Sequence, residues 1–329
     1  MTLRELNRTL LQRQLLLARS RLAPSKAVER LVALQAQYAP SPYVALWSRL
    51  EGFRKEQLTR GLAVGSIVKA SSLRLTLHVM TRAEFPYLAA ACIEGYRNRT
   101  EGRTSDLDAL RAAIPDEPLT SAEFFELGHR VLQTDDRWTV AFAFRSLAFV
   151  RTEPVGPWPH TKPSTALLWR EPLPEAQAGA ARVVRAYLAA YGPATRDDVR
   201  QFTGFRLGQI DPALEGLREL GDGLVDLPRA RLVRGDERAP VRFLPAFDSI
   251  ILAHRDRSRI VPPEYLEAVF NKKNATTKNT FTVDGFVAGA WRIEKRRLVL
   301  EPFAPLPVRV RREVEAEGER LLAWWLHSD

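Results

Sequence analysis

The sequence contains a single cysteine, Cys92, among 329 residues. One thiol cannot form an intramolecular disulfide or a cysteine-based zinc site, so both are excluded. No apolar run approaches the roughly 20 residues that span a bilayer. The first residues mix Arg and Glu with Leu, unlike a secretory signal. We therefore expect a cytoplasmic protein with no membrane partner.

Motifs of the common catalytic chemistries are missing as well. The chain has no P-loop, no Gly-x-Gly-x-x-Gly and no Gly-x-Ser-x-Gly motif. The signature of the zinc-dependent nucleobase deaminases is also absent. Five histidines lie at positions 78, 129, 160, 254 and 327, and none of them shows metal-ligand spacing. We expect no metal and no cofactor, and we interpret His78 and His129 as structural residues.

Lysine is scarce, since it supplies only eight of the 49 basic residues, yet the chain is strongly cationic. Against 39 acidic residues the net charge is +10. The codon bias of a GC-rich genome explains the preference for Arg over Lys, but it does not explain the excess of cations over acids. Such an excess is typical of proteins that bind nucleic acid or another polyanion.

The order of predicted elements favours an α+β fold. Four amphipathic helices are expected before residue 65, followed by a strand at 73–79. Helices followed by strands recur twice more, with Thr120 and Glu123 forming a capping-box pattern. After residue 240 short alternating strands predict a small β-barrel or curled sheet, with a hairpin turn at Asp284-Gly285, and a final helix. We predict three tandem winged-helix motifs plus a C-terminal β-barrel, divided as 1–100, 101–172, 173–237 and 238–329.

Two basic stretches are candidates for contact with DNA phosphates. The first contains His254, Arg255, Arg257 and Arg259, and the second, which is predicted to form a protruding hairpin, contains Lys272, Lys273 and Lys278. Phosphate contacts from such groups supply affinity without sequence choice. The alternative is that these residues lie on exposed strand edges, where charged side chains prevent pairing with other chains. In a net-positive chain with helices in this order, we favour DNA.

The segment "LVALQAQYAP" (31–40) places Gln35 and Gln37 where an apolar helix runs out before Pro40. On a regular helix two such residues point about 200° apart. Proline disfavours the helical conformation in the residue before it, so a loosened helix end could turn both amides toward one target. From the residues alone, a polar helix end is the favoured interpretation of the pair.

Several segments in order resemble the winged-helix DNA glycosylases typified by AlkZ and its relative YcaQ. They include "LNRTLLQRQLLL", "LVALQAQYAPSPYVALWSRL", "LRLTLHVMTRAEF", "KPSTALLW", "LPAFDSIILAHRDRS" and "FTVDGFVAGAWRIE". The resemblance implies a C-shaped molecule that holds duplex DNA, and a catalytic role for Gln35 and Gln37. In the YcaQ branch an acidic residue occupies the position that corresponds to Gln37. The glutamine at that position therefore places this chain on the AlkZ-like side. Members of that branch protect producers of DNA-alkylating antibiotics.

The resemblance implies an enzyme acting on double-stranded DNA with alkylated guanine, including bulky adducts or interstrand crosslinks. The sequence shows no lyase lysine near Gln37 and no strong oligomer signal, so we expect a monofunctional enzyme that is a monomer. An N7-alkylated guanine is cationic, so its departure needs no protonation, and two amides could hold a water beside the sugar. Which residue acts as a general base stays open. Two alternatives remain: a winged-helix regulator that binds DNA without catalysis, and a resistance protein that sequesters a small-molecule drug.

Overall fold

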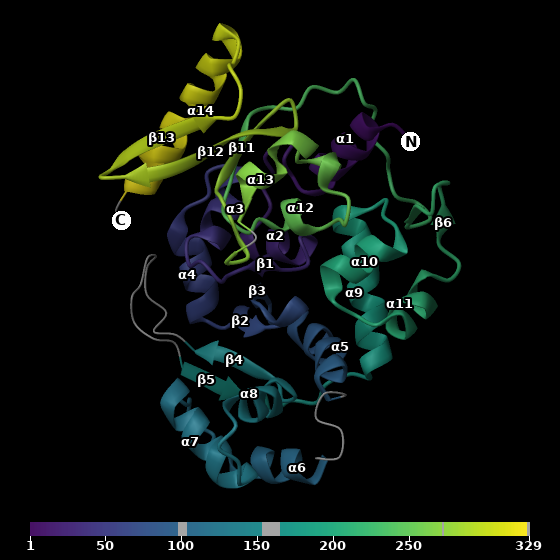
Figure 1. Ribbon diagram of the computed structural model, residues 1–329, viewed down its shortest axis with the longest axis vertical. Coiled ribbons are helices and arrows are strands. Elements are labelled where there is room, and N and C mark those ends of the chain that lie inside the picture. The colour runs from purple at the N-terminus through teal and green to yellow at the C-terminus, as the bar shows by residue number, and fades with distance from the viewer. Residues whose placement is uncertain (98–103, 153–164, 272, 328–329) are drawn as a thin grey trace.

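The computed structural model describes residues 1–97, 104–152, 165–271 and 273–327 (Figure 1). The helices are α1 (Leu3–Arg13), α2 (Pro24–Arg30), α3 (Ser41–Arg49), α4 (Lys55–Ala63), α5 (Phe85–Arg97), α6 (Thr104–Ala113), α7 (Ser121–Leu132), α8 (Arg137–Arg145), α9 (Ala176–Tyr191), α10 (Arg196–Thr203), α11 (Leu207–Leu214), α12 (Ser249–Leu252), α13 (Leu266–Val269) and α14 (Val308–Leu326). Single 3₁₀ turns cover η1 (Leu73–Leu75), η2 (Arg257–Arg259) and η3 (Pro263–Tyr265).

The strands form one larger sheet, a second open sheet and two short hairpins. They are β1 (Leu34–Gln35), β2 (Ile67–Ser71), β3 (Leu77–Thr81), β4 (Phe149–Thr152), β5 (Thr165–Leu168), β6 (Arg218–Glu219), β7 (Val225–Asp226), β8 (Arg242–Leu244), β9 (Phe270–Asn271), β10 (Thr276–Thr277), β11 (Thr280–Val283), β12 (Phe286–Glu294) and β13 (Arg297–Pro302). Helices followed by a strand pair recur three times, in the order expected from the sequence: α1–α4 with β2–β3, α6–α8 with β4–β5, and α9–α11 with β6–β7.

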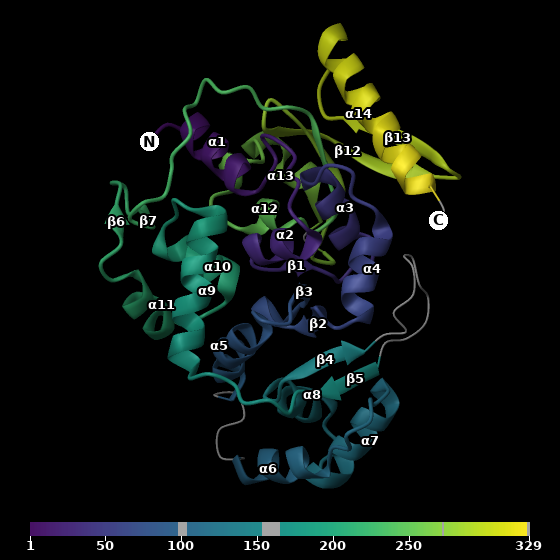
Figure 2. The ribbon, with the colours of Figure 1, turned by 180° about the vertical axis from the view of Figure 1, so that it is seen from behind.

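The larger sheet has the antiparallel order β1-β3-β2-β4-β5. It combines strands from both sides of the predicted boundary at residue 100, because Lys69 of β2 pairs with Arg151 of β4. Helices α6, α7 and α8 cover β4 and β5 and enclose a separate small core around Leu110, Val140 and Phe144. Helix α5 packs against α9 and connects this end of the molecule to the rest (Figures 1 and 2).

The C-terminal strands form an open sheet, which corrects the predicted closed barrel. Their order is β13-β12-β11-β8, and no described residue pairs the two edge strands with each other. The Asp284-Gly285 turn between β11 and β12 is present as predicted, with positive φ at both residues. Helix α14 packs on the sheet, so a helix covers the surface that a barrel would have enclosed.

The segment "SIILAH", expected as a strand, forms the short helix α12 instead. Asp248 caps this helix, since its carboxylate accepts a hydrogen bond from the backbone N–H of Ile250 at 3.1 Å. A run of four apolar residues fits a strand and a buried helical turn equally well. The cap at Asp248 decides in favour of the helical turn. It also fixes the position of the Asp248 carboxylate, which makes a second contact.

That second contact is a buried ion pair between α3 and the start of α12. Both oxygens of Asp248 accept hydrogen bonds from the Arg49 guanidinium at 2.8 Å, and both side chains are 0% exposed. Gln14 accepts a further bond from Arg49 at 3.3 Å. The pair joins the N-terminal segment to the C-terminal segment inside the protein, where an unpaired charge is costly.

We expect Asp248→Ala to lower the free energy of unfolding by about 3–5 kcal/mol, because it leaves the Arg49 charge buried without a partner. Urea denaturation measures the change. The matched control is Asp236→Ala, which removes an exposed partner of Arg234 and should cost less than about 1 kcal/mol. Equal effects of the two substitutions would contradict the role assigned to the buried pair.

Candidate functional site

The segment that carries Gln35 is a strand rather than a helix end. Helix α2 stops at Arg30, and Val32 adopts φ 70°, a left-handed conformation that is strained for a β-branched residue. Leu34 and Gln35 then pair with Val79 and His78 of β3. Gln37 lies beyond the end of this strand, so the change from helix to strand does not place the two amides on one face.

Gln35 and Gln37 are both held against the start of β3, but in different ways. Gln35 is buried, with 6% exposure, and its Oε1 has no hydrogen-bond partner among the described residues. Gln37 is exposed, and its Oε1 accepts a hydrogen bond from the backbone N–H of Leu77 at 3.1 Å. One amide is therefore anchored through its oxygen, while the other keeps a free acceptor inside the protein.

Gln35 lines a pocket of about 720 Å³ that is built from both ends of the chain. Gln35 and Arg74 come from the N-terminal segment, and the other lining residues come from the C-terminal segment: Phe247, Leu252, Arg257, Pro263, Leu266, Glu267, Phe270, Asn271, Ala275, Thr276 and Thr277. The volume lies within the range of small-molecule and cofactor sites. Gln37 does not line this pocket.

Two arginines of the pocket have no acidic partner in the described part of the chain. The Arg74 guanidinium donates to the Phe202 carbonyl and lies 5.3 Å from the centre of the Phe202 ring. Arg257 lies 4.3 Å from the centre of the Phe270 ring, and its Nε is unpartnered. Burial lowers the pKa of both guanidinium groups. Desolvated arginines of this kind suit a phosphate, which guanidinium binds through paired hydrogen bonds.

Glu267 is the one acidic residue among the described residues that line the pocket. It lies in α13, which follows η3 directly, whereas Gln35 lies near the N-terminus. The sequence analysis missed Glu267 and Arg74, because no local motif surrounds either residue and only the folded chain brings them to Gln35. A carboxylate thus lies on the wall of the pocket that contains the unpartnered amide.

The first predicted basic stretch is only partly on the surface. His254 is buried, with its Nε2 3.0 Å from the Tyr191 carbonyl, and Arg259 is buried beside Asp198 at 3.7 Å. This burial removes both from the set of candidate DNA contacts. Arg255 is exposed and forms an ion pair with Asp197 at 2.6 Å. Arg257 lines the pocket beside Gln35.

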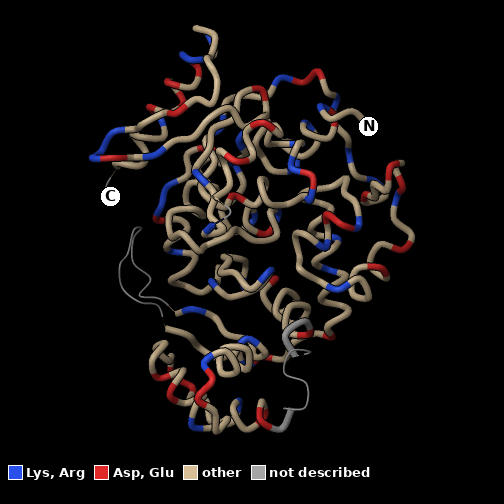
Figure 3. Tube along the Cα trace, viewed as in Figure 1, with Lys and Arg blue, Asp and Glu red and all other residues tan. Residues whose placement is uncertain are grey.

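The second basic stretch forms the predicted hairpin, with β9 and β10 paired through Asn271 and Thr276. Lys273 is exposed on its turn, while Lys272 lies outside the described residues. Lys278 is exposed, with its Nζ 3.9 Å from the Glu301 carboxylate. Figure 3 shows basic and acidic residues interleaved along most of the trace, so the net charge is spread over the molecule.

Tyr38 follows the catalytic candidates directly and exposes 46% of its surface. Few large apolar side chains of this protein are that exposed, and this one adjoins Gln37. An exposed aromatic ring offers a face for stacking on a base or for attracting a cation.

In the part of the chain that the structure describes, no helix is long and apolar enough to cross a membrane. The same residues contain no group of three or more His, Cys, Asp or Glu side chains arranged to hold a metal ion.

Comparison with known proteins points to DNA repair. Residues 28–324 match the sequence profile described as DNA glycosylase AlkZ-like. A relative from Streptomyces sahachiroi, named interstrand DNA cross-link repair glycosylase, is 25% identical over 344 aligned positions, which cover 91% of each chain. The solved structure of Streptomyces sahachiroi DNA glycosylase AlkZ is similar in fold, with a TM-score of 0.79, 22% identity, and coverage of 98% of this chain and 97% of that one.

The histidines that adjoin the site predict a pH dependence of stability. Burial, and next to it the charge of Arg74, lowers the pKa of His78 to about 3. Burial also lowers the pKa of His254, to about 3. Below the ordinary histidine pKa the unfolded chain binds protons that the folded protein does not, so stability falls as pH falls. Between about pH 7.5 and about pH 5 each histidine should remove about 2 kcal/mol from the free energy of unfolding.

Urea denaturation across that pH range measures the slope, and His78→Gln should reduce it by about half. An unchanged slope in His78→Gln would show that His78 takes up a proton in the folded protein.

Proposed function

Because this chain belongs to the family of AlkZ-like DNA glycosylases, we propose that it is a monofunctional glycosylase that hydrolyses the N-glycosidic bond of N7-alkylated purines. The observation that carries the proposal is the buried Oε1 of Gln35, which has no partner among the described residues and lines a pocket with two unpaired arginines. A buried acceptor without a partner costs free energy, so it calls for a functional explanation.

The chemistry of an N7-alkylated purine matches neutral catalytic groups. Alkylation places a positive charge on the base, and departure of the base neutralises that charge. The leaving group therefore needs no proton, and the developing charge lies on the sugar as an oxocarbenium-like cation. Glutamine cannot act as an acid at ordinary pH, but its carbonyl oxygen can face that cation and accept from water.

The two amides have complementary tasks in this proposal. Gln35 offers its free carbonyl oxygen to the sugar or to the attacking water, in an environment where burial strengthens the electrostatic interaction. Gln37 is anchored through its oxygen to Leu77, which turns its amide donors outward to orient the nucleophile or the phosphate beside it. Glu267 lines the same pocket and is the candidate to accept the proton of the water.

The arginines of the pocket are proposed to bind the backbone around the lesion. Arg74 and Arg257 lie on the pocket wall with Gln35, and a phosphodiester group would supply the anion that neither has among the described residues. Lys273 on the β9–β10 hairpin and Arg255 are exposed candidates for further phosphate contacts. Phosphates bound at these points would hold the sugar beside Gln35 without any reading of sequence.

We further propose that the substrates include bulky adducts and interstrand crosslinks. The pocket of about 720 Å³ beside Gln35 is wider than one base requires, and Gln37 lies outside it on an exposed edge. The relative from Streptomyces sahachiroi is named for repair of crosslinks, which supports the same substrate class here. The protein is proposed to act as a monomer on double-stranded DNA, in an architecture of tandem winged helices.

A regulator that reads DNA without catalysis is less well supported. The last helix of the third helical unit, α11, would have to enter a major groove. It carries Asp211, which is paired with Arg196 at 2.5 Å, and it has no basic residue between Leu207 and Leu214. Such a helix offers no basic side chain of its own to a negatively charged partner.

Gln35→Ala and Gln37→Ala should each slow base release by about 100-fold, the cost of removing one positioned catalytic hydrogen-bonding group. The assay is a duplex with one N7-methylguanine, incubated with protein, treated with alkali and run on a gel. Binding to intact duplex, measured by mobility shift, should be unchanged. Gln201→Ala, on the exposed face of α10, is the matched control. Wild-type cutting rates in both site variants would refute the assignment.

The proposed chemistry also predicts selectivity by the charge of the leaving base. Duplexes that carry uracil or hypoxanthine should release their base at least about 100-fold more slowly than N7-methylguanine, because a neutral base needs a general acid to leave. The comparison uses the same protein, sequence and gel assay. Comparable rates for the neutral and the cationic bases would overturn the mechanism while leaving the glycosylase family intact.

A further inference from the structure

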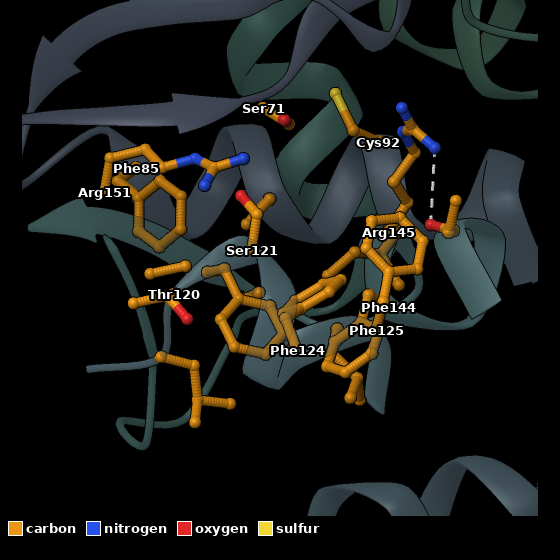
Figure 4. A pocket seen from close by; sticks show the side chains of 18 residues that line it. Ser71, Phe85, Cys92, Thr120, Ser121, Phe124, Phe125, Phe144, Arg145 and Arg151 are labelled. Atoms are coloured by element: carbon orange, nitrogen blue, oxygen red, sulfur yellow. Dashed lines mark hydrogen bonds between the residues drawn. The ribbon is translucent and has the colours of Figure 1, made fainter. Parts of the chain in front are cut away.

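A second pocket, of about 210 Å³, lies between α5, α7, α8 and β4 (Figure 4). It shares no lining residue with the pocket beside Gln35. Its walls are largely aromatic, contributed by Phe85, Phe124, Phe125, Phe144 and Phe149. The volume is below that of drug-sized sites, so the pocket suits a molecule with about one ring.

Two arginines line this apolar pocket without a carboxylate partner in the described chain. Arg151 projects from β4 and Arg145 from α8, and Figure 4 shows their guanidinium groups on opposite sides of the pocket. Arg145 forms a long hydrogen bond to the Ala141 carbonyl, at 3.4 Å, and lies 5.9 Å from the centre of the Phe142 ring. Burial, and next to it the charge of Arg145, lowers the pKa of Arg151. Two like charges thus face one small cavity.

Other desolvated arginines of this protein have acidic partners. The lack of a carboxylate beside Arg151 among the described residues is therefore informative. Arg8 is bound to Asp284, Arg242 faces Glu317, and Arg259 faces Asp198. Among the described residues, the other desolvated arginines without an acidic partner are Arg74 and Arg257, which line the proposed DNA site. A desolvated guanidinium is stable when an anion shares its environment, so the chain leaves this role to a ligand in both pockets.

The rim of the second pocket is polar and adds hydrogen bonds without adding negative charge. Ser71, Thr120 and Ser121 are exposed there, and Figure 4 shows the Ser121 hydroxyl on the Arg151 side of the cavity. Cys92 also lines the pocket, and burial raises the pKa of its thiol to about 12, so it stays neutral. The neighbouring acid, Glu123, is held by Thr120 at 2.7 Å and does not line the pocket.

We propose that this pocket binds a small aromatic anion, a carboxylate or phosphate attached to a single ring. The ring would pack among the phenylalanines, and the anionic group would bind Arg151 with help from Ser121. Arg145 would add its charge from the opposite wall. This is a second site, separate from base release, and it does not rest on the proposed function.

Titration calorimetry on the full-length protein tests the proposal with phenyl phosphate and benzoate as probes. Both should bind, and benzamide, the neutral match of benzoate, should bind at least about 10-fold more weakly, since a charge-assisted hydrogen bond is lost. Inorganic phosphate should also bind more weakly, because it has no ring. Arg151→Gln should weaken phenyl phosphate at least about 10-fold, whereas Arg130→Gln, an exposed substitution on α7, should not.

The outcomes separate an aromatic-anion site from its alternatives. Equal binding of benzamide and benzoate would overturn the proposal even if Arg151→Gln failed to fold. Equal binding of inorganic phosphate would show that the ring contributes nothing and would also overturn it. Displacement of phenyl phosphate by a short single-stranded oligonucleotide would assign the arginines to DNA phosphate, again against the proposal. Base release is expected to stay unchanged in Arg151→Gln.

Discussion

The buried pair of Arg49 and Asp248 is the contact on which the candidate active site depends. Arg49 ends the helix that follows Gln35 and Gln37, while Asp248 caps α12 and follows Phe247, which lines the pocket beside Gln35. The pair therefore fixes the N-terminal amides against the C-terminal wall. Hydrogen bonds from the Ser41 hydroxyl to the Ala246 carbonyl at 2.7 Å and from the Ser249 hydroxyl to the Ala33 carbonyl at 3.5 Å join the same two segments.

The positive charges of the pocket arginines are unfavourable for the proposed chemistry. A positive charge develops on the sugar, and nearby guanidinium groups would oppose it if they were bare. DNA resolves the conflict, because each bound phosphate compensates an arginine. The net field at the sugar then comes from phosphates and from the Gln35 carbonyl oxygen. Neutral amides are an advantage in this setting, since they bind no proton and do not repel the DNA backbone.

Local signals in the sequence predicted local structure well. The Thr120–Glu123 capping box, the stop at Gly204 and the Asp284-Gly285 turn are all formed, because each depends on neighbouring residues. The elements that local signals did not predict depend on contacts between residues far apart in the sequence. The apolar residues within 31–35 have the spacing of a helix, yet Leu34 and Gln35 pair with β3 and form a strand. Likewise α14 covers a sheet that was expected to close. Gln35 was found through a resemblance, whereas Arg74 and Glu267 meet it only in the folded protein.

The central claim is that the two amides stabilise a cationic sugar. Its most direct test is the affinity of the protein for duplexes in which a cationic pyrrolidine replaces the lesion nucleoside, compared with a neutral tetrahydrofuran at the same position. The account predicts tighter binding of the cationic analogue by wild-type protein and loss of that preference in Gln35→Ala. Equal affinity of wild-type protein for the two analogues, or a preference that survives in Gln35→Ala, would contradict it.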